Sequence, residues 1–100
     1  MLKNADITFN ENRFLVSGDL NFSNVMSVYE NSLNQLHHCR ELRFDFSQLR
    51  SSDSSGLALI MEWIKFARQH QKAVHFSHLS QDLMSLAKVS GLDKIIPNHM

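Results

Sequence analysis

One hundred residues suffice for one globular domain but not for two, and a chain of this length buries roughly 60–70% of its unfolded surface in a single core. The composition is 43% hydrophobic and 20% charged, with one proline and three glycines, which excludes collagen-like, low-complexity and disordered classes. Ten basic residues balance ten acidic ones, so the chain lacks the basic excess that a nucleic-acid partner requires.

Neither a membrane span nor export is predicted. The longest apolar run, Leu57–Met61, is far shorter than the roughly 18 residues that a bilayer-spanning helix needs. Residues 1–10 contain no apolar signal-peptide core and no small-residue cleavage site. The single cysteine, Cys39, cannot form an internal disulfide, which agrees with a reducing compartment. We therefore expect a cytoplasmic protein.

The first third of the chain predicts a hairpin followed by a helix. Alternating residues 7–9 and the run 14–16 flank a polar turn, which is typical of a β-hairpin. Gly18-Asp19 is expected to break the second strand, and Ser23 to cap the helix. Apolar residues then recur near helical spacing up to about His37.

Alternating strand and helix signals continue to the end of the chain. A third strand is predicted at 42–46, a polar loop at 48–55 and a long helix at 55–69. A fourth strand at 73–76 precedes a helix at 81–90, which Ser80 caps and Gly91 terminates. This order indicates one α/β domain over residues 1–100, with a mixed sheet that opens with a hairpin and is covered by helices on one side.

The helix at 55–69 is apolar over an unusually wide arc. At 100° per residue its apolar side chains span about 220°, whereas a one-sided surface helix uses roughly 100° or slightly more. Leu59 and Phe66 lie at one edge of the arc and Met61 at the other. Either a neighbouring element covers these edges, or Leu59, Met61 and Phe66 belong to a surface that binds a partner.

The stretch Asp53-Ser54-Ser55-Gly56 precedes this helix and allows two interpretations. Side-chain oxygens at a helix start accept hydrogen bonds from unpaired N–H groups, so these residues can be simple caps. A hydroxyl exposed at the same place is also a good phosphoryl acceptor, and a phosphate adds about −1.5 to −2 charges. The stretch is therefore both a capping sequence and a candidate switch.

The same stretch lies within a longer pattern that resembles the signature of STAS domains. Residues 45–57 read Asp-x-Ser, an apolar residue, and then Asp-Ser-Ser-Gly-Leu. Gly18-Asp19-Leu20 is similar to the family's motif after the second strand, and residues 86–92 are similar to its last helix. The resemblance covers essentially the whole chain and implies the STAS fold.

Two branches of the family imply different partners. In anti-anti-sigma factors, an anti-sigma kinase phosphorylates the serine that follows the aspartate, here Ser54. In the small cytoplasmic STAS subunit of the Mla phospholipid ABC transporter, that position is usually Thr followed by two Gly, whereas this chain has Ser54-Ser55-Gly56. Residues 56–60 and 64–71 nevertheless look closer to the transporter subunit. We favour that branch, in which the partner is the transporter's ATPase subunit and the membrane is reached only through it.

The remaining polar residues do not favour an enzyme or a metalloprotein. Six histidines are present, but His37-His38 and the pair His75 and His78 lack Cys, Glu or His at zinc-like spacing. A nucleophile elbow, a P-loop and a Gly-rich dinucleotide motif are all missing from the sequence. We therefore expect a non-enzymatic domain without metal or cofactor that acts by binding another protein.

Overall fold

The computed structural model describes residues 5–96 and 98–99. Residues 1–4, part of the segment on which the absence of a signal peptide was predicted, lie outside the described residues. The elements are β1 (Asp6–Asn10), β2 (Arg13–Leu20), α1 (Val25–His38), β3 (Glu41–Ser52), α2 (Ser55–Gln69), β4 (Ala73–Ser77), α3 (Gln81–Val89), a 3₁₀ turn (Asp93–Ile95) and β5 (Asn98–His99). Within the described part of the chain, no helix is long and apolar enough to cross a membrane.

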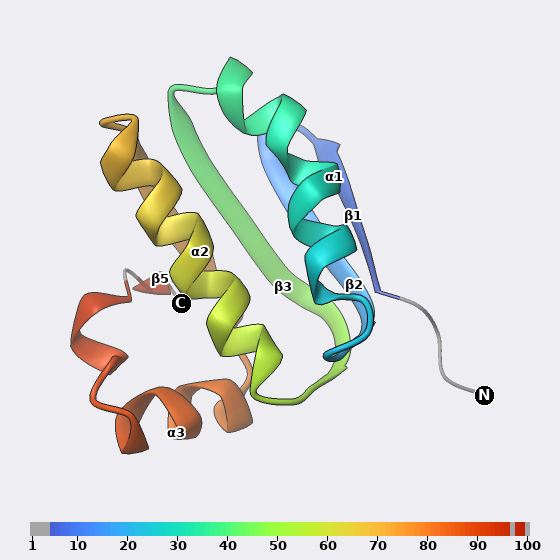
Figure 1. Cartoon of the computed structure of the whole chain (residues 1–100), viewed down its shortest axis with the longest axis vertical. Helices are drawn as coiled ribbons and strands as arrows, with labels where there is room; N and C mark the ends of the chain where they lie inside the picture. The colour runs from blue at the N-terminus through green and yellow to red at the C-terminus, as the bar shows by residue number, and fades with distance from the viewer. Residues whose placement is uncertain (1–4, 97, 100) are drawn as a thin grey trace.

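The strands form one mixed sheet in the order β1-β2-β3-β4-β5. β1 pairs antiparallel with β2, and the other neighbours pair in parallel. In Figure 1, α1 lies over β1 and β2, α2 lies on the same face beyond β3, and α3 flanks the start of α2. The predicted fold, a mixed sheet that opens with a hairpin and carries its helices on one side, is confirmed.

The opening hairpin closes through a two-residue turn with left-handed backbone. Glu11 and Asn12 have φ of 52° and 63°, the conformation of the type I′ turn that matches the twist of paired strands. Beyond the hairpin, Gly18 and Asp19 do not end the strand as predicted. β2 continues to Leu20 because Gly18, at φ 84°, absorbs a register shift against β3 without steric cost.

The third strand is longer than predicted. Residues 48–52, expected in a loop because they are polar, extend β3 to Ser52 by pairing with the end of β2. Strand pairing satisfies backbone hydrogen bonds whatever the side chains are. The polar composition of residues 48–52 therefore gave a wrong end for β3. The two-residue strand β5 was not predicted.

The predicted boundary residues of α3 agree with the structure, but the predicted N-cap of α1 does not. Asn24, not Ser23, occupies the N-cap of α1, and Ser23 instead donates through its N–H and hydroxyl to Asn21 Oδ1, at 3.0 and 2.7 Å. Ser80 caps α3 as predicted, because its hydroxyl accepts the Leu83 N–H at 3.1 Å. Gly91 follows α3 with φ 73°, the left-handed stop that was predicted.

An aromatic stack centred on β3 fills the core between the sheet and α2. The ring of Phe44 lies 3.9 Å from Trp63, 5.0 Å from Phe14 and 5.3 Å from Phe76, measured between centroids. Trp63 is fully buried, and its indole N–H donates to Ser32 Oγ at 3.0 Å. This bond satisfies the one polar atom of the Trp63 side chain and ties α2 to α1.

The wide apolar arc of α2 is mostly core. Leu59 and Phe66 are only 2% and 5% exposed, so the prediction that they belong to a partner surface is wrong. A neighbouring element does reach this edge, since the ring of His37 on α1 lies 5.0 Å from Phe66. Met61, at the opposite edge, is half-buried and stays a partner-surface candidate.

We predict that substitution by alanine destabilises the domain more at one edge of this arc than at the other. Leu59→Ala and Phe66→Ala should lower the free energy of unfolding by about 2–5 kcal/mol, as should Ile60→Ala, because each leaves a cavity in a packed core. Met61→Ala should cost less than about 1.5 kcal/mol, since its side chain is partly in solvent. Urea unfolding of the four variants measures this, and a Met61→Ala loss equal to that of Ile60→Ala would contradict it.

The side chain of one lysine caps the C-terminal end of α1 and connects it to the start of β4. The ammonium group of Lys72 donates to the carbonyls of Leu36, His37 and Cys39, at 2.8, 3.3 and 2.6 Å. Carbonyl groups in the last turn of a helix have no partner within the helix, and a cation there also matches the negative end of the helix dipole. Lys72 therefore holds the C-terminal end of α1 next to the start of β4.

Removing this ammonium group should destabilise the domain. We expect Lys72→Met to lower the free energy of unfolding by about 1–3 kcal/mol, because it keeps most of the aliphatic chain and leaves the carbonyls without their charged donor. Lys65→Met, at an exposed position of α2, is the matched control and should change stability by less than about 0.5 kcal/mol. Equal unfolding midpoints for the two variants would show that the three contacts contribute nothing.

Candidate functional site

The residues before α2 are held against the start of α1 by the long β3 strand. β3 pairs with β2 as far as Ser52 opposite Leu20, and the next N–H, that of Asp53, donates to the Leu20 carbonyl at 3.3 Å. Ser52 Oγ donates to the Asp53 carbonyl at 2.8 Å. In Figure 1, the starts of α1 and α2 accordingly lie at the same end of the molecule.

Asp53 is the residue that caps α2. Its Oδ1 accepts the N–H of Ser55 at 2.8 Å and also the hydroxyl of Ser55. These bonds from Ser55, together with one from the N–H of Phe22, outweigh a small burial effect and lower the pKa of Asp53. The carboxylate is therefore charged at neutral pH, and it links the start of α2 to the turn before α1.

Ser54 stands at the same helix start but makes no capping hydrogen bond. It is exposed, and its backbone already has helical angles, φ −63° and ψ −16°. Asp53 and Ser55 therefore carry out the capping that the sequence also allowed for Ser54. Of the two serines, only Ser54 presents its hydroxyl to solvent, because Ser55 is 5% exposed.

Gly56 is required by close packing. A Cβ built at this position would lie 2.1 Å from Ser52 Oγ and 3.1 Å from a methyl carbon of Leu83. The absence of a side chain thus allows the first turn of α2 to approach both the end of β3 and α3. Gly56 and Ser55 are buried, so they support the site from within, whereas Asp53 and Ser54 form its surface.

The Gly18-Asp19-Leu20 motif joins the same assembly from β2. Asp19 is buried, and its Oδ1 accepts the hydroxyl of Ser51 at 2.7 Å. Its backbone carbonyl accepts the side-chain amide of Asn24, the N-cap residue of α1, at 2.8 Å. The motif therefore fixes the entry to α1 relative to β3, and with it the turn that contains Phe22.

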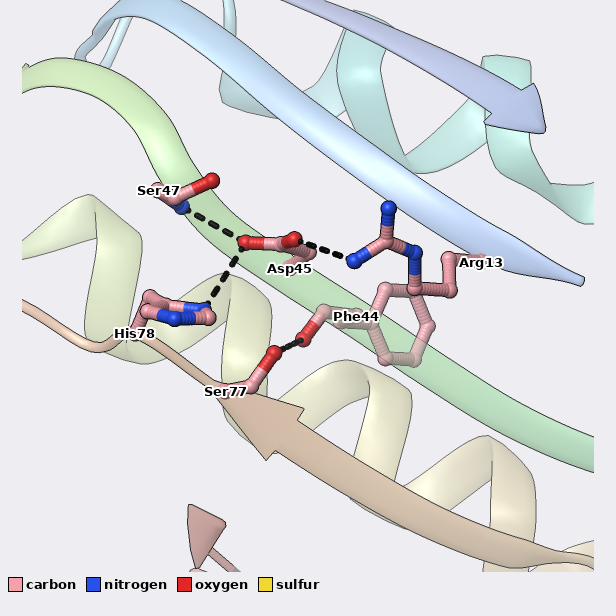
Figure 2. A network of polar contacts seen from close by, with 6 residues as sticks. All are labelled: Arg13, Phe44, Asp45, Ser47, Ser77 and His78. Atoms are coloured by element: carbon pink, nitrogen blue, oxygen red, sulfur yellow. Dashed lines mark hydrogen bonds and ion pairs between the residues drawn. The ribbon is translucent and has the colours of Figure 1, made fainter. Parts of the chain in front are cut away.

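The Asp-x-Ser part of the signature forms a separate polar network on β3. Asp45 is buried, and its carboxylate lies 2.9 Å from Arg13 Nη1, 3.3 Å from His78 Nδ1 and 2.8 Å from the N–H of Ser47 (Figure 2). Burial alone would raise the pKa of Asp45, but the hydrogen bonds from Ser47 and the charges of His78 and Arg13 lower it overall. This network joins β2, β3 and the end of β4, and it has a structural role.

Two exposed apolar residues beside the site were not singled out from the sequence. Phe22 is 80% exposed and Met26, in the first turn of α1, is 59% exposed. The sequence could have singled out Phe22 because it fits neither the helical nor the strand spacing of the neighbouring apolar residues. It lies between a strand end and a cap, where no core position is expected.

Other polar clusters of the described chain do not form a second site. No three His, Cys, Asp or Glu side chains gather as metal ligands within residues 5–96. A hollow of about 310 Å³ beside β3 and β4 is lined by Glu41, Arg43 and His75. Glu41 already lies 2.6 Å from Arg43 Nη2, so these two charges neutralise one another, and His75 Nε2 lies 3.5 Å from the same carboxylate.

Comparison with known families identifies one match that covers nearly the whole chain. The family described as Mlab, STAS domain, matches residues 4–97. No curated protein matches significantly.

Solved structures show the same fold at low sequence identity. A Thermotoga maritima protein provisionally assigned as an anti-sigma factor antagonist matches with a TM-score of 0.75 and 14% identity, covering 94% of this chain and 84% of that one. Unphosphorylated SpoIIAA, an anti-sigma factor antagonist, matches with 0.71 and 14%, covering 96% and 88%. A serine-to-glutamate variant of Moorella thermoacetica RsbS matches with 0.69 and 14%, covering 98% and 87%. At this identity the likeness shows the fold alone.

The lowered pKa of Asp45 predicts how stability changes in acid. A carboxylate whose pKa is lowered by folding stabilises the fold above its unfolded pKa, near 4, and loses this contribution as the pH falls through the folded value. We expect Asp45→Asn to cost about 1–3 kcal/mol at pH 7 and to flatten the loss of stability below about pH 4. Urea unfolding from pH 7 to pH 2.5 measures both, and parallel pH profiles for the variant and the parent would contradict the assignment.

Proposed function

The chain belongs to the family of Mlab STAS domains, and from this membership we propose that it is a non-enzymatic accessory subunit of a phospholipid ABC transporter. In this role it binds and stabilises the transporter's ATPase subunit, which supports lipid asymmetry of the outer membrane. It is cytoplasmic and reaches the inner membrane only as part of that complex. It needs neither a cofactor nor a catalytic residue.

One observation carries the proposed contact: the hydroxyl of Ser54 is exposed at the first turn of α2, while Asp53 and Ser55 provide the cap. A polar group that is free of a capping role, on a rigid helix start, can enter a protein interface without disturbing the fold. Asp53 is exposed beside it, and Met61 is half-buried further along the same helix. We assign Asp53, Ser54 and Met61 to the partner surface, and Ser55 and Gly56 to its support.

A second candidate function is that of an anti-anti-sigma factor. The specific observation in its favour is that Ser54 directly follows the capping aspartate, and that the similar structures include anti-sigma factor antagonists, SpoIIAA in its phosphorylated form among them. In this case an anti-sigma kinase is the partner, and phosphorylation of Ser54 is the switch. A phosphate there adds about −1.5 to −2 charges next to the Asp53 carboxylate, which would repel an acidic partner group and reorganise the contact.

We predict that Ser54→Glu and Ser54→Lys weaken capture of the chain by the ATPase subunit while leaving its melting temperature within about 2 °C of the parent. A long charged side chain in a desolvated contact is costly, whereas the same side chain at an exposed helix start is tolerated by the free domain. Co-purification of both subunits, followed by thermal melts of the free domain, measures the two effects. Ser85→Glu, at an exposed position of α3, is the matched control.

The identity of the binding partner distinguishes the two candidate functions. Undiminished capture of both Ser54 variants by the ATPase subunit would remove Ser54 from the contact. Incubation with an anti-sigma kinase and ATP, with mass spectrometry of the parent and of Ser54→Ala, tests the second function. A phosphate that appears on the parent and is absent from the variant favours the switch.

A further inference from the structure

The turn before α1 exposes two apolar side chains that the core does not use. Phe22 is 80% exposed and Met26, four residues later, is 59% exposed. Phe22 lies in the turn before α1 and Met26 in the first turn of α1, and the Val25 N–H donates to the Asn21 carbonyl at 3.0 Å, so the turn runs directly into the helix. Phe22 is far more exposed than the aromatic residues of the core, Phe14, Phe44 and Phe76, which are 1% exposed or less. Together with Met26 it forms an exposed apolar pair that is a candidate for contact with something outside the domain.

This apolar pair is fixed next to Ser54. The N–H of Asp53 donates to the Leu20 carbonyl at 3.3 Å, two residues before Phe22, and the Phe22 N–H is near enough to the Asp53 carboxylate to help lower its pKa. Asn24, between Phe22 and Met26, is held by Asp19 through its side-chain amide at 2.8 Å. The pair is therefore presented by an ordered turn, which lowers the entropic cost of binding.

The helices around the pair carry acidic groups, and Arg50, three residues before Asp53, lies 3.8 Å from the buried Asp19 carboxylate, with which it pairs. Residues 14–39 and 51–64 contain neither lysine nor arginine, so α1 and the first two turns of α2 lack a permanent positive charge. Glu30 is exposed one turn after Met26, and Glu62 is exposed two turns after Ser54. Burial first, and then the nearby Glu62 carboxylate, raise the pKa of Tyr29 on α1.

We infer that this acidic-apolar face, formed by Phe22, Met26, Glu30, Asp53, Ser54 and Glu62, docks a partner segment that carries lysine or arginine around an apolar anchor. The anchor packs on Phe22 and Met26, and the basic groups face the three carboxylates. An anionic lipid surface is a poor occupant because the carboxylates repel it. The inference rests on the proposed function for the existence of a protein partner, but the chemistry of the segment follows from this face.

A labelled peptide tests that chemistry without the partner. The probe is a fluorescein-labelled amphipathic helix of about 16 residues, with leucine on one face and lysine beside it. We expect it to bind the full chain, to bind Phe22→Ala and Met26→Ala about tenfold more weakly, and to bind Val89→Ala as it binds the parent. Val89 is the matched control because it is an apolar residue that is 88% exposed on α3. A peptide with glutamate at each lysine position should not bind.

Three results would overturn the inference. The first is equal affinity of the probe for the parent, Phe22→Ala and Met26→Ala, and the second is binding of the glutamate peptide. The third is binding of the chain to vesicles of anionic phospholipid that is lost in Phe22→Ala, since it would make the face a lipid site. Charge reversal in Glu30→Lys should weaken binding of the lysine peptide about tenfold or more, and unchanged affinity would argue against the proposed chemistry.

A parallel capture by the ATPase subunit separates this inference from the proposed function. If the ATPase subunit captures Phe22→Ala and Glu30→Lys as well as it captures the parent, the inference fails and the proposed function stands. If the ATPase subunit does not bind the parent while the lysine peptide binds with the expected variant pattern, the proposed function fails and the inference stands.

Discussion

The parallel pairing of β2 with β3 is the constraint on which the candidate site depends. It extends to Leu20 and Ser52, so that the two strands end side by side and release α1 and α2 from the same edge of the sheet. The Asp53 N–H continues the pairing to the Leu20 carbonyl, and the Asp53 carboxylate then reaches Ser55 and Phe22. Without this pairing, the cap of α2 and the turn before α1 would be independent loops.

Different chemistry holds the starts of the two covering helices and the end of α1. At the N-terminal end of α2, the carboxylate of Asp53 accepts the N–H of Ser55, and it lies near the Phe22 N–H in the turn before α1. At the C-terminal end of α1, the ammonium of Lys72 donates to three carbonyls. An anion at helix starts and a cation at a helix end both agree with the helix dipole. Between these ends, the bond from Trp63 to Ser32 sets the contact of α2 with α1.

The sequence allowed the fold class and most element boundaries to be predicted because hydrophobic period and capping residues are local signals, as Ser80 and Gly91 illustrate. It misplaced the ends of β2 and β3, because pairing between polar strands leaves no periodic pattern in either one. It also left open whether Leu59 and Phe66 are core residues or partner-surface residues, since a single helix cannot show which neighbour covers it. Asp53 and Ser54 were identified, but which of them caps α2 depends on the backbone geometry.

The charges of this chain are neutral in sum but unevenly distributed, and this distribution gives its two faces different roles. On the sheet, three carboxylates have an arginine near them: Asp45 has Arg13, Glu41 has Arg43 and Asp19 has Arg50. Such pairs satisfy their own charges and leave little for a partner to complement. Around the starts of α1 and α2, Glu30 has no lysine or arginine within nine residues in sequence, and Arg50, three residues before Asp53, lies against Asp19 instead. Both carboxylates are exposed on the side of the molecule that also exposes Phe22. A surface with uncompensated charge and exposed apolar area gains most from a partner of opposite charge, so the helical face is the one suited to binding.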